Sequence, residues 1–208
     1  QVSGGTYYRW SLGAGVELWA QADQDGRLIG LNPHFSGTAR TRVGLIKPIA
    51  RENDSTLDGA FYGWAGPVEN DPANGEYPFV FDLPDFKRHD HLTLPTIVNA
   101  QIAAFAHSLS AFESDEAVRS GETHMMAAES CIPSGTFSTP PQSTVVFYGH
   151  VLNTAQLTNP HTKHTFYWAR VRTLGGEFDV VADPEIVKGA IVQGGVIGGS
   201  AWLSGRII

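Results

Sequence analysis

Hydrophobic and polar positions alternate along several short stretches of this chain, the pattern expected of β-strands that bury one face. The first stretch is residues 13–31, GAGVELWAQADQDGRLIGL, in which Val16, Leu18 and Ala20 occupy alternate positions. The run DQDG that follows has the composition of a turn, so this stretch predicts a β-hairpin. A third strand is expected over residues 39–49, where a proline near the end breaks the pattern.

Residues 50–85 carry few regular signals and are dense in Asn, Asp, Gly and Pro. A purely polar loop would not need aromatic rings, yet this segment contains Phe61, Tyr62, Trp64, Tyr77, Phe79 and Phe81. The simplest interpretation is a long connection that packs onto a sheet through its rings, with a short buried strand at residues 77–81. Long irregular segments of compact domains also often carry binding sites.

Residues 96–112 are ambiguous because two patterns overlap in them. Five apolar side chains fall at helical spacing, namely Val98, Ile102, Phe105, Leu109 and Phe112. The preceding LTLP and the strand-rich remainder of the chain favour a strand that ends near residue 111, so helix and strand both stay open. Beyond it, Ser114 and the two acidic residues that follow predict a short capped helix, ended by Gly121.

The last third of the chain has the clearest strand pattern. Four runs are separated by turn-forming residues: 144–152, 165–174, 177–182 and 194–208. Glycines in the final run allow the sharp bending that closure of a small barrel requires. This layout resembles the five-stranded OB-fold.

These patterns together predict a mainly β protein with at most one or two short helices. We expect an antiparallel β-rich region with a long aromatic loop over residues 1–128, a linker over 129–142, which has three prolines and no periodicity, and an OB-like barrel over 143–208. The phrases YPFVFD, IPSG, WARVRTLGGEFDVVADPE and WLSGRI also resemble a family of uncharacterised bacterial proteins. That resemblance implies no particular activity.

The stretch YWARVRTLGGEFDVVADP, residues 167–184, alternates aromatic and arginine side chains, as surfaces that bind single-stranded nucleic acid do. If the two glycines form the turn, Arg172 faces Asp179, and Arg170 lies diagonally between Asp179 and Asp183. A phosphate-binding groove would leave its arginines unopposed. The pairing therefore favours a solvated ladder of ion pairs over a nucleic-acid surface.

The composition is that of a turn-rich globular chain, with 42% hydrophobic and 17% charged residues among 208. The formal net charge of −7 repels a phosphate backbone, which makes nucleic acid an unlikely partner. The single cysteine, Cys131, excludes an internal disulfide and slightly favours the reducing cytoplasm, although the start without methionine leaves a removed leader open. Since no apolar run approaches about 20 residues, a membrane-spanning helix is not expected.

The strongest metal-ligand signal is FKRHDHL, in which His89 and His91 point the same way if the segment is extended. Asp85, Asp90 or a remote histidine would complete such a site. The alternative is a pair of surface histidines beside acidic residues. No nucleophile elbow, phosphate loop or dinucleotide fingerprint is present, and the lone thiol of Cys131 is interpreted as a small buried side chain.

The leading functional hypothesis is a binding or assembly module that recognises a protein partner, including a second copy of itself, without a catalytic motif. Its candidate binding residues are Trp64, Trp168, Arg170 and Arg172. The alternative is a metal-dependent hydrolytic enzyme that uses His89 and His91, and the third hypothesis is OB-type binding of single-stranded nucleic acid. The first requires no cofactor, whereas the second requires a divalent metal ion.

Overall fold

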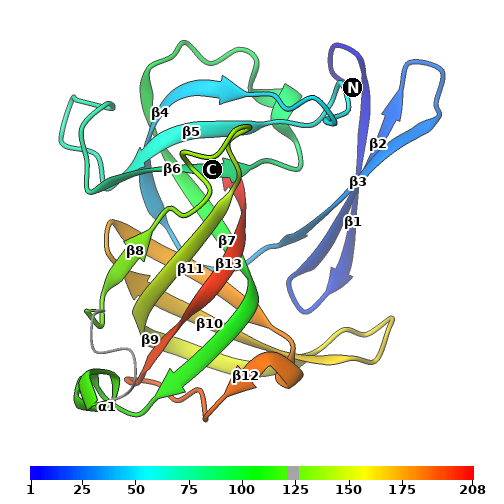
Figure 1. The fold of residues 1–208 in the computed structure, drawn as a ribbon. Helices are drawn as coiled ribbons and strands as arrows, with labels where there is room; N and C mark the ends of the chain where they lie inside the picture. The colour runs from blue at the N-terminus through cyan, green and yellow to red at the C-terminus, as the bar shows by residue number, and fades with distance from the viewer. Residues whose placement is uncertain (121–126) are drawn as a thin grey trace.

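The structure is a computed structural model of the chain and describes residues 1–120 and 127–208. The expected mainly β fold is confirmed, since a three-stranded antiparallel sheet stands beside a large mixed sheet (Figure 1). Helices of the described residues are limited to α1 (Asp115–Ser120) and the 3-10 helices η1 (Phe86–His89) and η2 (Pro184–Ile186). None of them has both the length and the apolar character needed to span a membrane.

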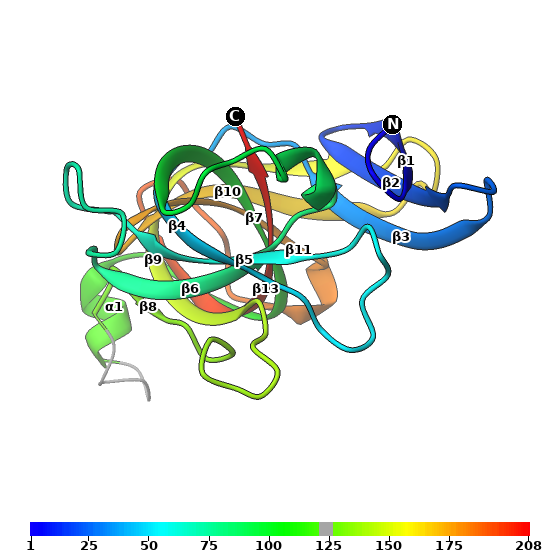
Figure 2. The same ribbon diagram turned by 90° about the horizontal axis from the view of Figure 1, so that it is seen from above.

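The small sheet consists of β1 (Gly5–Gly13), β2 (Val16–Asp23) and β3 (Leu28–Phe35), in that order. The predicted β2–β3 hairpin is confirmed, and the Asp23 carboxylate caps its turn by accepting from the backbone of Asp25. Strand β1 was not predicted from the sequence, because large side chains lie on both of its faces and mask the alternation. This sheet projects from one side of the molecule (Figures 1 and 2).

The large sheet is built from ten strands. The strands are β4 (Thr41–Ile49), β5 (Ala60–Ala65), β6 (Tyr77–Asp82), β7 (Thr96–Phe112), β8 (Ser130–Ile132), β9 (Thr144–Thr158), β10 (Thr165–Thr173), β11 (Gly176–Ala182), β12 (Val187–Lys188) and β13 (Val196–Ile207). Strands on both sides of the predicted linker belong to this one sheet. The division of the chain into two domains stays a prediction.

The pairings of the large sheet form a barrel-like ring with uneven closure. Strands β7 and β13 pair with each other along nearly their whole length. One path runs from β7 through β4, β5 and β6 back to β13, and a second runs from β7 through β11, β10 and β9 back to β13. The first path is the weaker, because β6 and β13 meet at the single pair Asp82–Ser204.

Residues 96–112 form the strand β7, which settles the ambiguity between helix and strand. Residues 101–104 are buried without interruption, because neighbouring elements cover this strand on both faces. A strand covered on both faces loses its alternation, and its apolar run can then match helical spacing by coincidence. The predicted capped helix is confirmed as α1, where Ser114 Oγ accepts from the Ala117 amide at 3.3 Å, while Gly121 lies outside the described residues.

Two other expectations need correction. The aromatic segment 50–85 contains the strand β5 as well as the predicted buried strand β6. Strand β5 was not predicted because Gly63 interrupts its hydrophobic pattern. This glycine packs against the backbone of Gly44. The β10–β11 hairpin also turns at Leu174 and Gly175 rather than at the two glycines, since Thr173 pairs with Gly176. Arg172 therefore faces Glu177, and Arg170 faces Asp179.

The core of the ring is a layer of aromatic and aliphatic side chains. Phe79 and Phe81 stack with ring centroids 5.3 Å apart, and Phe147 meets Phe178 edge to face at 6.1 Å. Gly205 lies beneath the ring of Phe81, where any Cβ would overlap the ring. At least this glycine of the final strand thus makes room for a core side chain.

Candidate functional site

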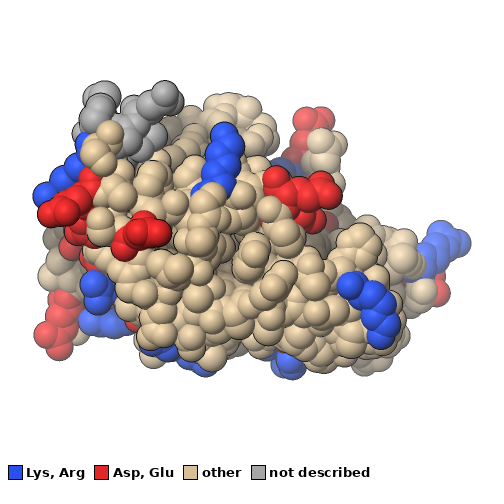
Figure 3. All heavy atoms as spheres, turned by 90° about the horizontal axis from the view of Figure 1, so that it is seen from below, with Lys and Arg blue, Asp and Glu red and all other residues tan. Residues whose placement is uncertain are grey.

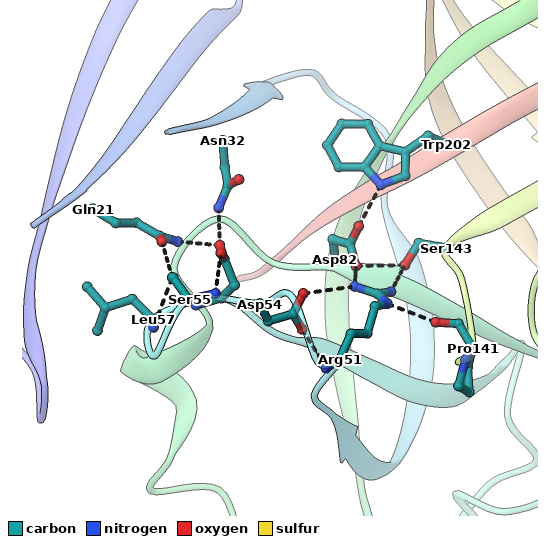
Figure 4. Close-up of polar contacts among 11 residues, drawn as sticks. Gln21, Asn32, Arg51, Asp54, Ser55, Leu57, Asp82, Pro141, Ser143 and Trp202 are labelled. Carbon is teal, nitrogen blue, oxygen red and sulfur yellow. Dashed lines mark hydrogen bonds and ion pairs between the residues drawn. The ribbon is translucent and has the colours of Figure 1, made fainter. Parts of the chain in front are cut away.

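A polar cluster centred on Arg51 joins the 50–59 loop to the barrel (Figure 4). The guanidinium of Arg51 contacts Asp82 Oδ1 at 2.8 Å through Nη1, donates to the Pro141 carbonyl at 2.8 Å and reaches Ser143 Oγ at 3.1 Å. Asp82 also accepts from Ser143 Oγ at 2.8 Å and from the Trp202 indole at 2.6 Å. One carboxylate at the end of β6 therefore gathers three otherwise separate segments.

Asp58 plays the same part for the small sheet. Its Oδ1 accepts from the side-chain amides of Gln21 and Asn32, both at 2.7 Å, and its Oδ2 accepts from the Ser55 backbone at 3.0 Å. Gln21 and Asn32 lie on the inner face of β2 and β3, so Asp58 fixes that face against the 50–59 loop. This cluster is a brace between the sheet and the barrel.

A cavity of about 150 Å³ lies between these two carboxylates. It is lined by Asn32, Arg51, Asp54, Asp58, Gly59, Asp82, Leu83, Pro84, Trp202 and Ser204. Its Asn32, Arg51 and Trp202 donors already bond Asp58 or Asp82. The polar atoms that face the cavity are therefore mainly carboxylate oxygens. Such an excess of hydrogen-bond acceptors over donors is typical of a structural network.

A second polar system, fully buried, runs beside this cavity. His34 contacts Ser204 Oγ at 2.9 Å through Nδ1 and Gln101 Oε1 at 2.8 Å through Nε2. Gln101 then donates to Asp179 Oδ2 at 2.7 Å. Because the amide of Gln101 donates to Asp179, its oxygen accepts from His34 Nε2–H, so the Ser204 hydroxyl must donate to Nδ1.

Burial keeps this histidine neutral. Desolvation lowers the pKa of His34 from its ordinary value to about 4, and the hydrogen bond to Gln101 opposes that shift only in part. Both ring nitrogens are occupied, and His34 and Ser204 are each 1% exposed. The Ser–His contact has the geometry of an activated hydroxyl, but a ring with so low a pKa is a weak base. The relay is best explained as a satisfied polar core.

Asp179 anchors the buried relay at its far end. It is 0% exposed and accepts from Gln101, from the indole of Trp168 and from the backbone of Thr38 and Ala39. Neighbouring Gly37 allows this close approach, because a Cβ there would overlap the Asp179 carboxylate. The hydrogen bonds to Asp179 therefore hold the connection between β3 and β4 against β11.

The outward face of the small sheet is apolar and exposed. Tyr8, Ala20 and Leu31 form one row across its three strands, and Trp10, Leu18 and Pro33 form the next. Tyr8 is 61% exposed, Trp10 55% and Leu31 52%. We call these six residues the outer apolar face. Large exposed apolar surfaces of this kind are typical of protein–protein contacts.

The four predicted binding residues do not form one surface. Trp168 is half-buried, donating to Asp179 at 2.9 Å and stacking on Phe35, and Trp64 is half-buried on β5. Arg170 lies 3.5 Å from Glu177, and Arg172 donates to Glu129 at 2.7 Å. Their role in binding stays a prediction. The acidic partners of the two arginines are not the expected Asp179 and Asp183, and Asp179 is fully buried rather than part of a solvated ladder.

His89 and His91 lie in and just after η1, not in an extended strand. His89 contacts Asp85 at 3.3 Å, His91 bonds the Arg88 carbonyl at 3.0 Å, and the two ring centroids are 6.4 Å apart. Over residues 1–120 and 127–208, no three His, Cys, Asp or Glu side chains are grouped to hold a metal ion. The metal site stays a prediction that lacks a third ligand in this part of the chain.

His150 links the segment that contains Asp115 to the segment that contains Glu129. Its Nδ1 contacts Glu129 and its Nε2 contacts Asp115, both at 2.8 Å, and Arg172 also bonds Glu129. Burial alone would lower the pKa of His150, but the hydrogen bonds to Asp115 and Glu129 outweigh it and raise the pKa.

Cys131 is buried, as expected, and desolvation raises its thiol pKa to about 12, which makes it a poor nucleophile.

Sequence reasoning did not single out Arg51, Asp58 or His34, and it assigned Asp179 only as an ion-pair partner of the two arginines. The partners of these side chains are distant along the chain, up to 170 residues apart for His34 and Ser204, so no local motif marks them. The only usable signal was the aromatic segment 50–85, identified as a place where binding sites occur.

No family model, curated protein or solved structure matches this chain. The resemblances to the OB-fold and to a family of bacterial proteins therefore gain no support from these comparisons.

Proposed function

We propose that this protein is an assembly module that binds a second copy of itself through the outer apolar face. The observation that carries the proposal is the pair of apolar rows across β1, β2 and β3, in which Tyr8, Trp10 and Leu31 are each more than half exposed. Water contact with such rings and aliphatic chains is unfavourable, and a second apolar surface would remove it.

The relief of this face suits self-association. Ala20 is small and stands between Tyr8 on β1 and Leu31 on β3, so in this row a shallow trough separates the aromatic ridge of β1 from the aliphatic ridge of β3. Under a twofold axis parallel to β2, the aromatic ridge of one copy would lie over the aliphatic ridge of the other. An isologous contact of this kind brings one patch against itself.

Electrostatics favours the same face. The chain carries a formal charge of −7, so two copies repel each other on average. The outer apolar face contains no charged side chain. Copies can therefore approach there without bringing like charges into direct contact.

The size of the sheet sets the expected strength. Three strands spaced about 4.8 Å apart, with eight residues rising about 3.3 Å each, cover roughly 380 Å². A stable interface usually buries about 800 Å² on each partner. We therefore expect a weak dimer whose population depends on concentration.

Sedimentation velocity over a wide range of protein concentration tests the proposal. The unmodified chain should show a rising average mass, and the double variant Tyr8→Lys/Leu31→Lys should stay monomeric. Phe137→Lys is the matched control, because Phe137 is 78% exposed but lies outside the small sheet. A monomer at every concentration, or a dimer that the double variant retains, would refute the proposal.

The two other hypotheses remain proposals with less support. The metal-dependent enzyme would need a ligand beyond His89 and His91. Nucleic-acid binding would need a concentration of basic residues, whereas on the face in Figure 3 Lys and Arg are scattered among Asp and Glu with wide uncharged surface between them. Elemental analysis and titration with a single-stranded oligonucleotide would test these alternatives directly.

A further inference from the structure

A second cavity, with a volume of about 300 Å³, opens between the end of β3, the strands β7 and β11, and the β9–β10 hairpin. It shares no lining residue with the outer apolar face or with the polar cavity beside Arg51, although Trp10 of that face contacts His161 of the same hairpin. Its lining includes His34, Phe35, Phe105, Ala106, Phe166 and Asp183. A pocket with mostly apolar walls and a few polar groups is the usual form of a small-molecule site.

The inner walls are aromatic. Phe35 meets Phe166 edge to face with ring centroids 6.1 Å apart, and Phe105 and Val181 pack in the same cluster. The His34 ring adds a wall without hydrogen-bonding capacity, because Ser204 and Gln101 occupy both of its nitrogens. This part of the pocket can therefore hold an apolar, flat group but offers it no polar partner.

The polar groups gather at the rim. Asp183 is the one Asp, Glu, Lys or Arg among the described residues that line the pocket. Its Oδ1 accepts from the Glu185 amide at 2.9 Å, and no hydrogen bond to its Oδ2 is found among residues 1–120 and 127–208. Glu185 and Lys163 lie in the adjoining hollow, where Lys163 donates to the Pro160 carbonyl at 2.6 Å. The local charge thus adds to the negative field of the chain and favours a cation.

We infer that this pocket binds a small aromatic molecule that carries a protonated amine. The ring would fill the space among Phe35, Phe105 and Phe166, and the ammonium would meet Asp183 at the rim. A volume of about 300 Å³ lies at the lower end of the range for ligand pockets, which suits a small ligand such as one fused pair of rings. Aromatic walls and a carboxylate both attract a cation carried by an apolar body.

Three ligands that share one ring system test this inference: 2-(aminomethyl)naphthalene, 2-naphthalenemethanol and 2-naphthoate. Isothermal titration of the full chain should show saturable 1:1 binding of the amine, at least ten-fold tighter than binding of the carboxylate, with the alcohol between them. Asp183→Asn should reduce the preference for amine over carboxylate several-fold. An asparagine can still accept from the Glu185 amide, so the local turn is kept.

Ala106→Phe should fill the pocket and weaken binding of all three ligands at least ten-fold. Ala73→Phe and Asp25→Asn are the matched controls, since both positions lie in exposed turns away from the pocket. Thermal unfolding of each variant separates loss of the pocket from loss of the fold, and Asp183→Asn tests the charge preference independently if Ala106→Phe unfolds. Absence of saturable amine binding, binding that a folded Ala106→Phe retains, or equal affinity for amine and carboxylate would overturn the inference. Tyr8→Lys/Leu31→Lys should bind the amine normally, so this result is independent of self-association.

Discussion

The indole of Trp168 donates its Nε1–H to Asp179 Oδ1 at 2.9 Å, from β10 to the neighbouring strand β11. This bond holds the indole of Trp168, which belongs to the alternating aromatic and arginine pattern, against a buried carboxylate. Two backbone amides and Gln101 share the same carboxylate. Asp179 is therefore the point at which the β3–β4 connection, β7 and β10 meet.

Asp179→Asn should strongly destabilise the fold. An amide has one oxygen in place of two, so two of the four buried N–H donors would lose their acceptor. Each unsatisfied buried donor costs about 1–3 kcal/mol, so the expected loss for two donors is roughly 2–6 kcal/mol of unfolding free energy. Denaturant titration measures this change, and Asp25→Asn in an exposed turn should stay within about 0.5 kcal/mol of the parent. An equal effect of both substitutions would contradict the assigned role.

Protonation of His34 should contribute to acid unfolding. Its pKa is near 4 in the folded protein, against 6.5 in the unfolded chain, so the unfolded state binds the proton more readily. The contribution to stability is complete above pH 6.5 and is lost as the pH falls through about 4, by about 3 kcal/mol in total. Unfolding free energies at pH 7 and 4.5 should show a smaller pH dependence in His34→Gln. The exposed His164→Gln should keep the dependence of the parent.

His150 should act in the opposite sense. Its pKa is raised in the folded state by Asp115 and Glu129, so its contribution is complete below the unfolded pKa of 6.5. The contribution disappears as the pH rises through the folded pKa. Because all three side chains are partly exposed, we expect at most about 1 kcal/mol. His150→Gln should be less stable than the parent at pH 6 and nearly equal to it at pH 9, whereas the exposed His107→Gln should match the parent at both.

Asp58→Ala should loosen the small sheet before the barrel. The substitution removes the acceptor of the Gln21 and Asn32 amides, each bonded at 2.7 Å, and we expect a loss of roughly 2–4 kcal/mol. Hydrogen exchange should rise in β2 and β3 while the amides of β7 and β13 stay protected. Exchange that rises equally in both sheets would mean that Asp58 supports the whole fold rather than the contact of the small sheet.

Much of the fold could be predicted from local pattern. The β2–β3 hairpin, the buried strand β6, the capped helix α1 and the strands of the last third follow from alternation, turn residues and capping, which act over a few neighbouring positions. The sequence pattern missed β1 and left β7 open between helix and strand, because both faces of each strand look alike. Strand β1 carries large side chains on both faces, and residues 101–104 of β7 are buried on both.

The sequence alone determined a mainly β chain with an acidic surplus and a lone cysteine, because composition and short-range alternation are local properties. Only the tertiary structure decided which polar side chains meet. His34 reaches Ser204 across 170 positions, and Trp168 reaches Asp179 through a hairpin register that differs by two residues from the one expected. The outer apolar face and the aromatic pocket were likewise decided by strand pairing. The exposed fraction of a side chain depends on which other segments cover it. The residues next to it in the sequence do not specify those segments.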